Sequence, residues 1–133
     1  MRKNVQRSAG MVLLTISSLA TVFHVLVLSG LIDYRLVWGG RLKNPQEMQL
    51  FEVVSLVVNV CIMWLTAQRI RIVKAYISQR ILKWVFILLT VLFVLNTLGN
   101  LLSLNRLEAW IFTPVTCISA LCCLWLVRST EQH

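Results

Sequence analysis

The sequence predicts an all-α fold, a four-transmembrane-helix bundle with the N-terminus and the C-terminus both in the cytoplasm. Of the 133 residues 58% are hydrophobic and only 14% are charged, and the mean hydropathy is +0.77. Soluble domains are nearer half apolar and a quarter charged. The apolar residues form four runs, each close to the ~20 residues that a helix needs to cross a ~30 Å hydrocarbon core. Backbone polar groups in lipid must be paired within their own segment, so these runs are helices.

The four predicted spans cover residues of about 11–32, 48–67, 81–102 and 109–127. No polar stretch between them is long enough for a second domain, so residues 1–133 are expected to form a single integral membrane domain. A cleaved signal peptide is the alternative for the first span. Its apolar run exceeds the usual ~7–15 residues and no A-x-A site follows, so we expect a retained helix.

Basic residues predict the orientation. Nine Lys and Arg residues lie on one side of the predicted spans: before the first, near the connection between the second and third, and after the fourth. The connections on the other side contain four. Both termini are therefore expected in the cytoplasm. The formal net charge of +8 comes from residues in the gaps between apolar runs, which argues against a nucleic-acid partner.

Two spans have recognisable starts. Asn44 followed by Pro45 and Glu47 offers an N-cap, a proline in the first turn and a carboxylate three residues after the cap. Asn105 and Glu108 repeat the Asn-x-x-Glu spacing before the fourth span, so both glutamates are expected to stabilise helix starts. Pro114 should kink the fourth helix unless Thr113 caps it.

Polar side chains form one stripe in each span, and such groups usually face the interior of a bundle. The stripes are Ser17, Thr21 and His24; Glu52, Ser55 and Asn59; Asn96, Asn100 and Ser103; and Thr113, Thr116 and Ser119. At a rise of ~1.5 Å per residue, Glu52, Asn96 and His24 lie roughly 6, 9 and 12 Å below the outer boundary. The polar groups thus gather in the outer half.

Two interpretations of this gathering remain open. Either the groups hydrogen-bond to each other and hold the helices together, or they line a cavity open to the outside. In the second case Glu52 recognises charge, while Asn59, Asn96 and Asn100 orient a small polar or amphiphilic ligand. His24 would make binding depend on pH if it lies near, although a single histidine on this face is more often a satisfied interior residue.

The two longer connections have different compositions. In the first, Gly39-Gly40 permits a tight turn, and Trp38 either caps a cavity mouth or anchors the loop at the headgroups. The second, over residues 69–83, mixes basic and apolar side chains and should attract anionic lipid at about 1 kcal/mol per basic residue.

No catalytic residue, cofactor or metal site is predicted. The four cysteines, Cys61, Cys117, Cys122 and Cys123, lie inside apolar runs without zinc or dithiol spacing, and such thiols usually behave as small hydrophobic groups. An acid–base pair of Glu52 and His24 requires that the first two helices touch there. We therefore do not expect an enzyme.

The segment Val37-Trp38-Gly39-Gly40-Arg41-Leu42-Lys43 is similar to one found in a family of small bacterial inner-membrane proteins. So is Asn96-Thr97-Leu98-Gly99-Asn100-Leu101. The family is an uncharacterised four-helix one, so the resemblance implies a fold and an inner-membrane location but no activity. The leading hypothesis is a ligand-binding or transport-related role in the lipid bilayer. Transport by four short helices would require a homo-oligomer. The alternative is an accessory protein that contacts a membrane partner through its helices.

Overall fold

The computed structural model describes residues 2–128, and over these residues it is all-helical with no strand. Four long helices alternate with short connections, and two 3-10 turns lie in the first connection. They are α1 (Arg2–Leu28), η1 (Tyr34–Leu36), η2 (Trp38–Gly40), α2 (Pro45–Arg69), α3 (Gln79–Leu101) and α4 (Arg106–Arg128). All four α-helices are long and apolar enough to cross a membrane, which confirms the predicted fold class.

The first helix differs most from its predicted bounds. It begins at Arg2 instead of residue 11, because the polar N-terminal segment continues the helix beyond the apolar run. It ends at Leu28 instead of residue 32, because Gly30 adopts a left-handed φ of 80°. There the amide of Gly30 donates to Val27 O (3.0 Å) and the amide of Leu31 donates to Leu26 O (3.0 Å), a Schellman motif that closes the helix. The other bounds shift by three residues at most.

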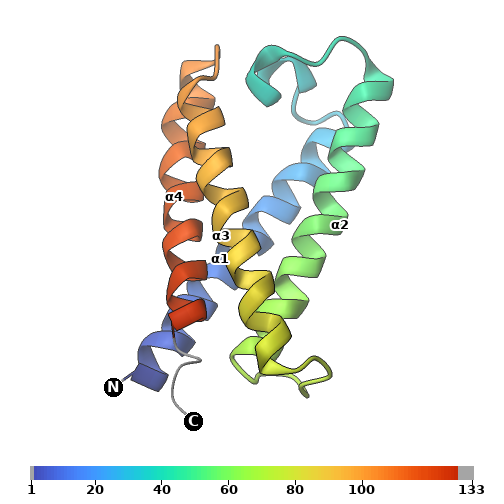
Figure 1. Cartoon of the computed structure of the whole chain (residues 1–133). Coiled ribbons are helices and arrows are strands. Elements are labelled where there is room, and N and C mark those ends of the chain that lie inside the picture. Colours follow the sequence, from blue (N-terminus) through green and yellow to red (C-terminus); the bar gives the residue numbers. More distant parts are fainter. Residues whose placement is uncertain (1, 129–133) are drawn as a thin grey trace.

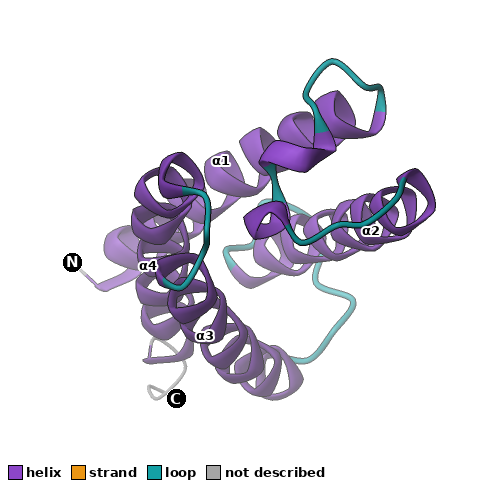
Figure 2. Ribbon diagram, turned by 90° about the horizontal axis from the view of Figure 1, so that it is seen from above, coloured by secondary structure: helices purple, strands orange, loops and turns teal. Residues whose placement is uncertain are grey.

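The helices form two pairs. Helix α1 packs along α2 and α3 packs along α4, and α1 also contacts α4, whereas α2 and α3 barely touch. In Figure 1 the pairs lie close together at the end where α1 begins and α4 ends, and they diverge towards the other end. Figure 2 shows the same gap between α3 and α2 from above. We call the first end the terminal end and the other, which carries residues 29–44, the loop end.

The main hydrophobic core is built from α1, α2, α3 and α4 together. Its buried members are Leu13, Ile62, Leu82, Phe86, Leu89, Cys122, Cys123 and Leu126. A second, smaller cluster joins Val27 of α1 and Met48 of α2 to Val37 of the first connection. Because Val37 is buried there, the connection is fastened onto the α1–α2 pair instead of extending freely into solvent.

A buried arginine joins three helices at the terminal end. Arg69 is 2% exposed, its Nε donates to Leu126 O of α4 (3.0 Å), and its Nη1 donates to Gln79 Oε1 of α3 (2.6 Å). Gln68 beside it is fully buried and accepts the amides of Tyr76 (2.8 Å) and Ile77 (3.1 Å). From the sequence, Arg69 is expected only to be one of the charges that set the orientation. In the structure it is an interior contact.

Gly10 is placed where α1 crosses the end of α2. A Cβ added there would lie 2.3 Å from Ile70 Cγ2, whereas a Cβ at Gly99 of α3 would meet nothing within 4 Å. We expect Gly10→Ala to lower the free energy of unfolding by about 1–3 kcal/mol, because the Ile70 side chain must give up its packing against α1. Gly99→Ala should be tolerated, since alanine is the better helix former. Thermal melting of both variants in the same detergent checks this, and equal melting temperatures would contradict the close crossing.

Candidate functional site

Glu52 forms the centre of a polar cluster at the loop end. Its side chain is fully buried, and each carboxylate oxygen has a partner from a different part of the chain. Nδ1 of His24, on α1, donates to Oε2 (2.6 Å), and Nε1 of Trp38, in the first connection, donates to Oε1 (2.8 Å). The pair of His24 and Glu52 that the sequence made conditional on helix contact is therefore formed.

The backbone of the first connection is strained where it delivers Trp38. Trp38 has a φ of 55°, in the left-handed region that residues with a bulky side chain rarely adopt. The next residue, Gly39, has a φ of 67° and occupies this region at little cost. The Trp38 ring also lies against Phe51, with ring centroids 5.0 Å apart. The hydrogen bond to Glu52 and this ring contact offset the strain at Trp38.

Glu108 ties the same connection to the other helix pair. Its Oε2 accepts the amide of Gly39 (2.6 Å) and the hydroxyl of Ser103 (3.0 Å). The side-chain amide of Asn105 donates to Leu36 O (2.6 Å) and adds a second link. The sequence assigned Glu108 to the start of the fourth helix. It lies in the first turn of α4 but bonds to the connection instead of closing a capping box.

Glu47 keeps the role expected of it. Its amide donates to Asn44 Oδ1 (2.8 Å), while its carboxylate accepts the amide of Lys43 (2.9 Å) at the start of α2. The two glutamates have the same spacing from an asparagine, so their difference arises from tertiary structure. Glu108 bonds to the middle of the first connection, at Gly39, whereas Glu47 bonds only to its last residues, directly before α2.

The predicted ligand-binding residues divide into separate groups. His24 and Glu52 meet, while Asn100 donates to Thr116 of α4 (3.3 Å), which also accepts the hydroxyl of Thr97 (2.9 Å). Asn59 donates to Ser55 O of its own helix (2.9 Å), and Asn96 is exposed. The polar stripes therefore converge within each helix pair. Across the described residues, no side-chain hydrogen bonds connect all five predicted residues into one site.

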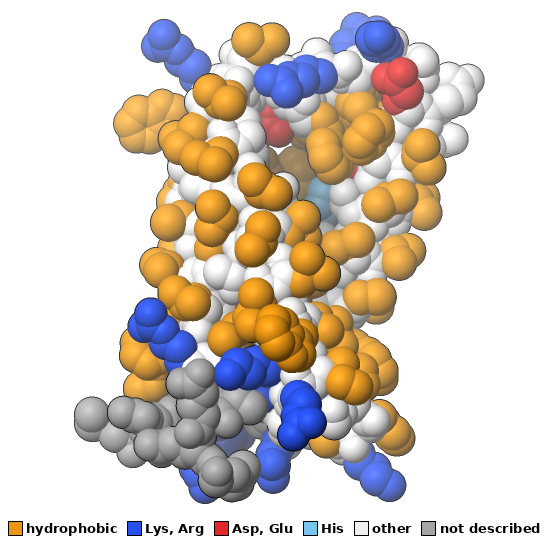
Figure 3. Space-filling model, in the orientation of Figure 1, with side chains coloured by type: hydrophobic (Ala, Val, Ile, Leu, Met, Phe, Trp, Pro, Cys, Tyr) orange, Lys and Arg blue, Asp and Glu red, His pale blue; other side chains and the backbone are white. Residues whose placement is uncertain are grey.

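A hollow lies between the two helix pairs at the loop end. Figure 3 shows it below the first connection, with a histidine side chain visible inside. His24 is 17% exposed, in contrast to the buried Glu52 behind it. On the opposite side α1 and α4 are joined by the rings of Phe23 and Phe112, with centroids 5.1 Å apart. The hollow thus opens on the side where α2 and α3 separate.

Sequence reasoning missed two groups of this cluster. Trp38 is predicted either at a cavity mouth or in the headgroup region, but the hydrogen bond from its indole N–H to a carboxylate inside the bundle is not predicted. Glu108 was assigned to helix capping.

Four apolar helices and a buried ionisable cluster define the class of this chain, a multi-pass membrane protein with a polar site inside its bundle. No family model, no curated protein and no solved structure matches it. Within residues 2–128, no group of three or more His, Cys, Asp or Glu side chains is arranged to hold a metal ion.

Proposed function

We propose that this protein binds a small polar or amphiphilic ligand in the hollow at the loop end, as a ligand-binding or transport-related protein. It resides in the bacterial inner membrane with both termini in the cytoplasm, so the hollow opens to the outer side. The observation that carries the proposal is the burial of Glu52 between His24 and Trp38 directly beside this hollow. A carboxylate inside a membrane bundle is costly and usually serves a function.

Glu52 and His24 have different roles in this proposal. Both oxygens of Glu52 already accept hydrogen bonds, so the carboxylate positions His24 instead of contacting the ligand. His24 Nδ1 is occupied, which leaves Nε2 as the ring atom for a ligand reaching the exposed edge of the side chain. A neutral ring holding its proton on Nδ1 presents an acceptor there, and this suits a hydroxyl or amine on the ligand.

The first connection acts as a lid over this site. Two carboxylates hold the middle of this connection, Glu52 of the α1–α2 pair at Trp38 and Glu108 of the α3–α4 pair at Gly39. Any widening of the gap between the pairs stretches one of these links. Ligand entry through the gap is therefore coupled to the position of Trp38 and Gly39. Figure 3 shows hydrophobic side chains around the hollow, and such surroundings suit an amphiphilic ligand whose tail remains in lipid.

Native mass spectrometry of the full chain, gently extracted from its own membrane, tests the proposal. The wild type should carry a reproducible adduct, and Glu52→Gln should lose it while still folding. Glutamine preserves the shape and can accept from Trp38, so the variant removes the charge that orients His24 more than it removes the packing. Glu47→Gln is the matched control, because Glu47 lies at the surface start of α2, away from the hollow.

Three outcomes separate the hypotheses. Loss of the adduct in Glu52→Gln but not in Glu47→Gln supports the site. An adduct-free spectrum for the wild type, repeated after extraction in a second mild detergent, contradicts a retained ligand. Stoichiometric co-extraction of a second protein without an adduct favours the accessory role. The sparse contact between α2 and α3 is the observation behind that alternative, because it leaves room for a partner's helix.

A further inference from the structure

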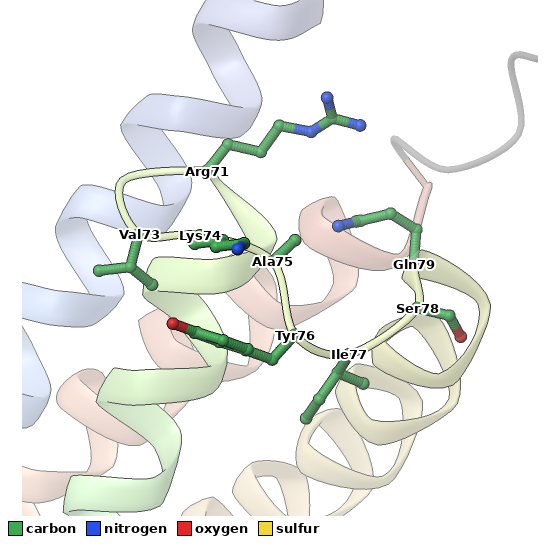
Figure 4. Close-up of a pocket in the computed structure, with 8 residues that line it drawn as sticks. All are labelled: Arg71, Val73, Lys74, Ala75, Tyr76, Ile77, Ser78 and Gln79. Atoms are coloured by element: carbon green, nitrogen blue, oxygen red, sulfur yellow. The ribbon is translucent and has the colours of Figure 1, made fainter.

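A second pocket lies at the terminal end, far along the helices from the loop-end hollow. It has a volume of about 540 Å³ and is formed by the connection between α2 and α3. Figure 4 shows the side chains around it, with the nitrogen-bearing ends of Arg71, Lys74 and Gln79 on its rim. All three groups are hydrogen-bond donors, and two of them are cations.

Among the described residues, no acidic side chain lies near the positive charge at this pocket. The chain has five acidic residues. Asp33, Glu47, Glu52 and Glu108 all lie at the loop end, and Glu131 lies outside the described residues. Among residues 2–128, neither Arg71 nor Lys74 is paired with a carboxylate. A pocket rimmed by cations without internal counter-charges is suited to an anion.

The backbone at Arg71 gives a second, independent observation. The amide of Arg71 donates to Gln68 O (3.2 Å) and that of Ile72 donates to Ala67 O (2.9 Å), which is a Schellman motif with Arg71 at its left-handed position. The φ of Arg71 is 58°. Helix α1 ends in the same motif with Gly30 at that position, the residue that fits it without strain. At α2 the chain carries an arginine where glycine would be more stable, and this arginine reaches the pocket rim.

Gln79 supplies a third observation. Its Oε1 accepts from Arg69, and because arginine can only donate, this contact fixes which end of the amide is the oxygen. The opposite nitrogen, Nε2, is buried and has no acceptor among the described residues. In Figure 4 this nitrogen points towards the side of the pocket where Arg71 lies. The site therefore lacks one hydrogen-bond acceptor, which an oxygen of a bound anion would provide.

Apolar side chains next to the pocket identify the surroundings of that anion. Ile72 is 50%, Val73 is 40% and Tyr76 is 72% exposed, and they lie between and after Arg71 and Lys74 along the connection. Basic and apolar side chains interleaved at the end of two spans are typical of a segment lying in the headgroup region. An anion that meets the pocket there is part of a lipid.

We propose that the pocket formed by Arg71, Lys74 and Gln79 binds the phosphate of an anionic lipid headgroup in the leaflet at the terminal end. Arg71 and Lys74 neutralise the phosphate, and the amide of Gln79 donates to one of its oxygens. The N-terminus of α3, which begins at Gln79 after the Ser78 cap, adds a favourable dipole. This site is independent of the proposed ligand site at the loop end.

The test measures lipid preference on the purified full chain by native mass spectrometry. The probes are dioleoyl phosphatidic acid and dioleoyl phosphatidylcholine in equimolar amounts, which share their acyl chains and differ in headgroup charge. The wild type should prefer phosphatidic acid. Arg71→Gly should reduce this preference about fivefold, and Arg71→Gly with Lys74→Gln about 30-fold. Arg71→Gly should also melt at a higher temperature than the wild type, because the left-handed position then carries glycine.

Arg80→Gln is the matched control, since it removes one exposed charge beside the pocket without belonging to its lining. A loss of preference in Arg80→Gln as large as in Arg71→Gly would overturn the proposal, because the effect would then be general surface charge. An unchanged preference in Arg71→Gly would overturn it as well. Displacement of phosphatidic acid by millimolar inorganic phosphate would assign the site to free phosphate and overturn the lipid assignment.

Discussion

Replacing Arg69 with methionine is expected to lower the free energy of unfolding by about 3 kcal/mol or more. The guanidinium donates to Leu126 O through Nε and to Gln79 Oε1 through Nη1, and it is 2% exposed. Methionine fills a similar volume but donates no hydrogen bond, so both acceptors lose the donors that Arg69 provides. The loss of a donor costs about 1–3 kcal/mol for each buried acceptor. Reversible unfolding in mixed micelles, followed by circular dichroism, measures the loss.

Two further variants distinguish hydrogen bonding from charge. Arg69→Lys keeps the charge but not the planar fork, so it should recover only part of the loss. Arg80→Met removes an exposed charge of the same segment and should change stability by less than about 0.5 kcal/mol. Equal stabilities for Arg69→Met and Arg80→Met would show that the contact with α4 contributes nothing.

The sequence was sufficient for the parts of this fold that depend on one helix at a time. Apolar runs of membrane length predicted all four helices, because a single span satisfies its own backbone in lipid. The start of α2 was predicted in detail, since Asn44 and Glu47 act within one turn. The end of α1 was placed four residues too late. The apolar run continues to Ile32, but Gly30 closes the helix before the run ends.

The candidate site depended on relations between helices, and these were only partly predictable. Helical spacing put His24 and Glu52 on polar stripes, and the structure brings the two together. The same spacing grouped Asn59 and Asn96 with them, although Asn59 bonds within its own helix and Asn96 is exposed. Periodicity fixes which residues share a face but not how each helix is rotated towards its neighbours. Trp38 reached the site through a strained backbone that no periodic pattern encodes.

The arrangement of tertiary links suggests how the two ends of the molecule differ. At the terminal end Arg69 binds α3 and α4 directly to α2, and the main core surrounds this region. At the loop end the helix pairs are joined mainly through the first connection, by Glu52 on one side and Glu108 on the other. We therefore expect opening of the gap to require release of the connection, while the terminal end stays intact.

Glu52→Ala is expected to lower the free energy of unfolding by about 3 kcal/mol and to free the first connection. The truncation leaves a cavity and removes the acceptor of both His24 and Trp38, and large-to-small changes at buried sites cost about 2–5 kcal/mol. The left-handed backbone of Trp38 costs about 1–3 kcal/mol, and without the hydrogen bond to Glu52 less remains to offset this cost. The backbone at Trp38 should then leave the left-handed region. Hydrogen exchange of residues 36–41 should accelerate about tenfold or more, because each 1.4 kcal/mol of lost protection is a factor of ten.

The pattern of exchange decides whether Glu52 or Glu108 holds the connection. Glu47→Ala is the control, and it should cost about 1 kcal/mol and accelerate exchange only around Lys43 and the first turn of α2. Glu52→Gln should exchange more nearly like the wild type, since glutamine still accepts from Trp38 Nε1. Unchanged exchange at residues 36–41 in Glu52→Ala would show that Glu108 and Asn105 hold the connection alone. In that case Glu52 would stabilise the α1–α2 pair without controlling access to the hollow.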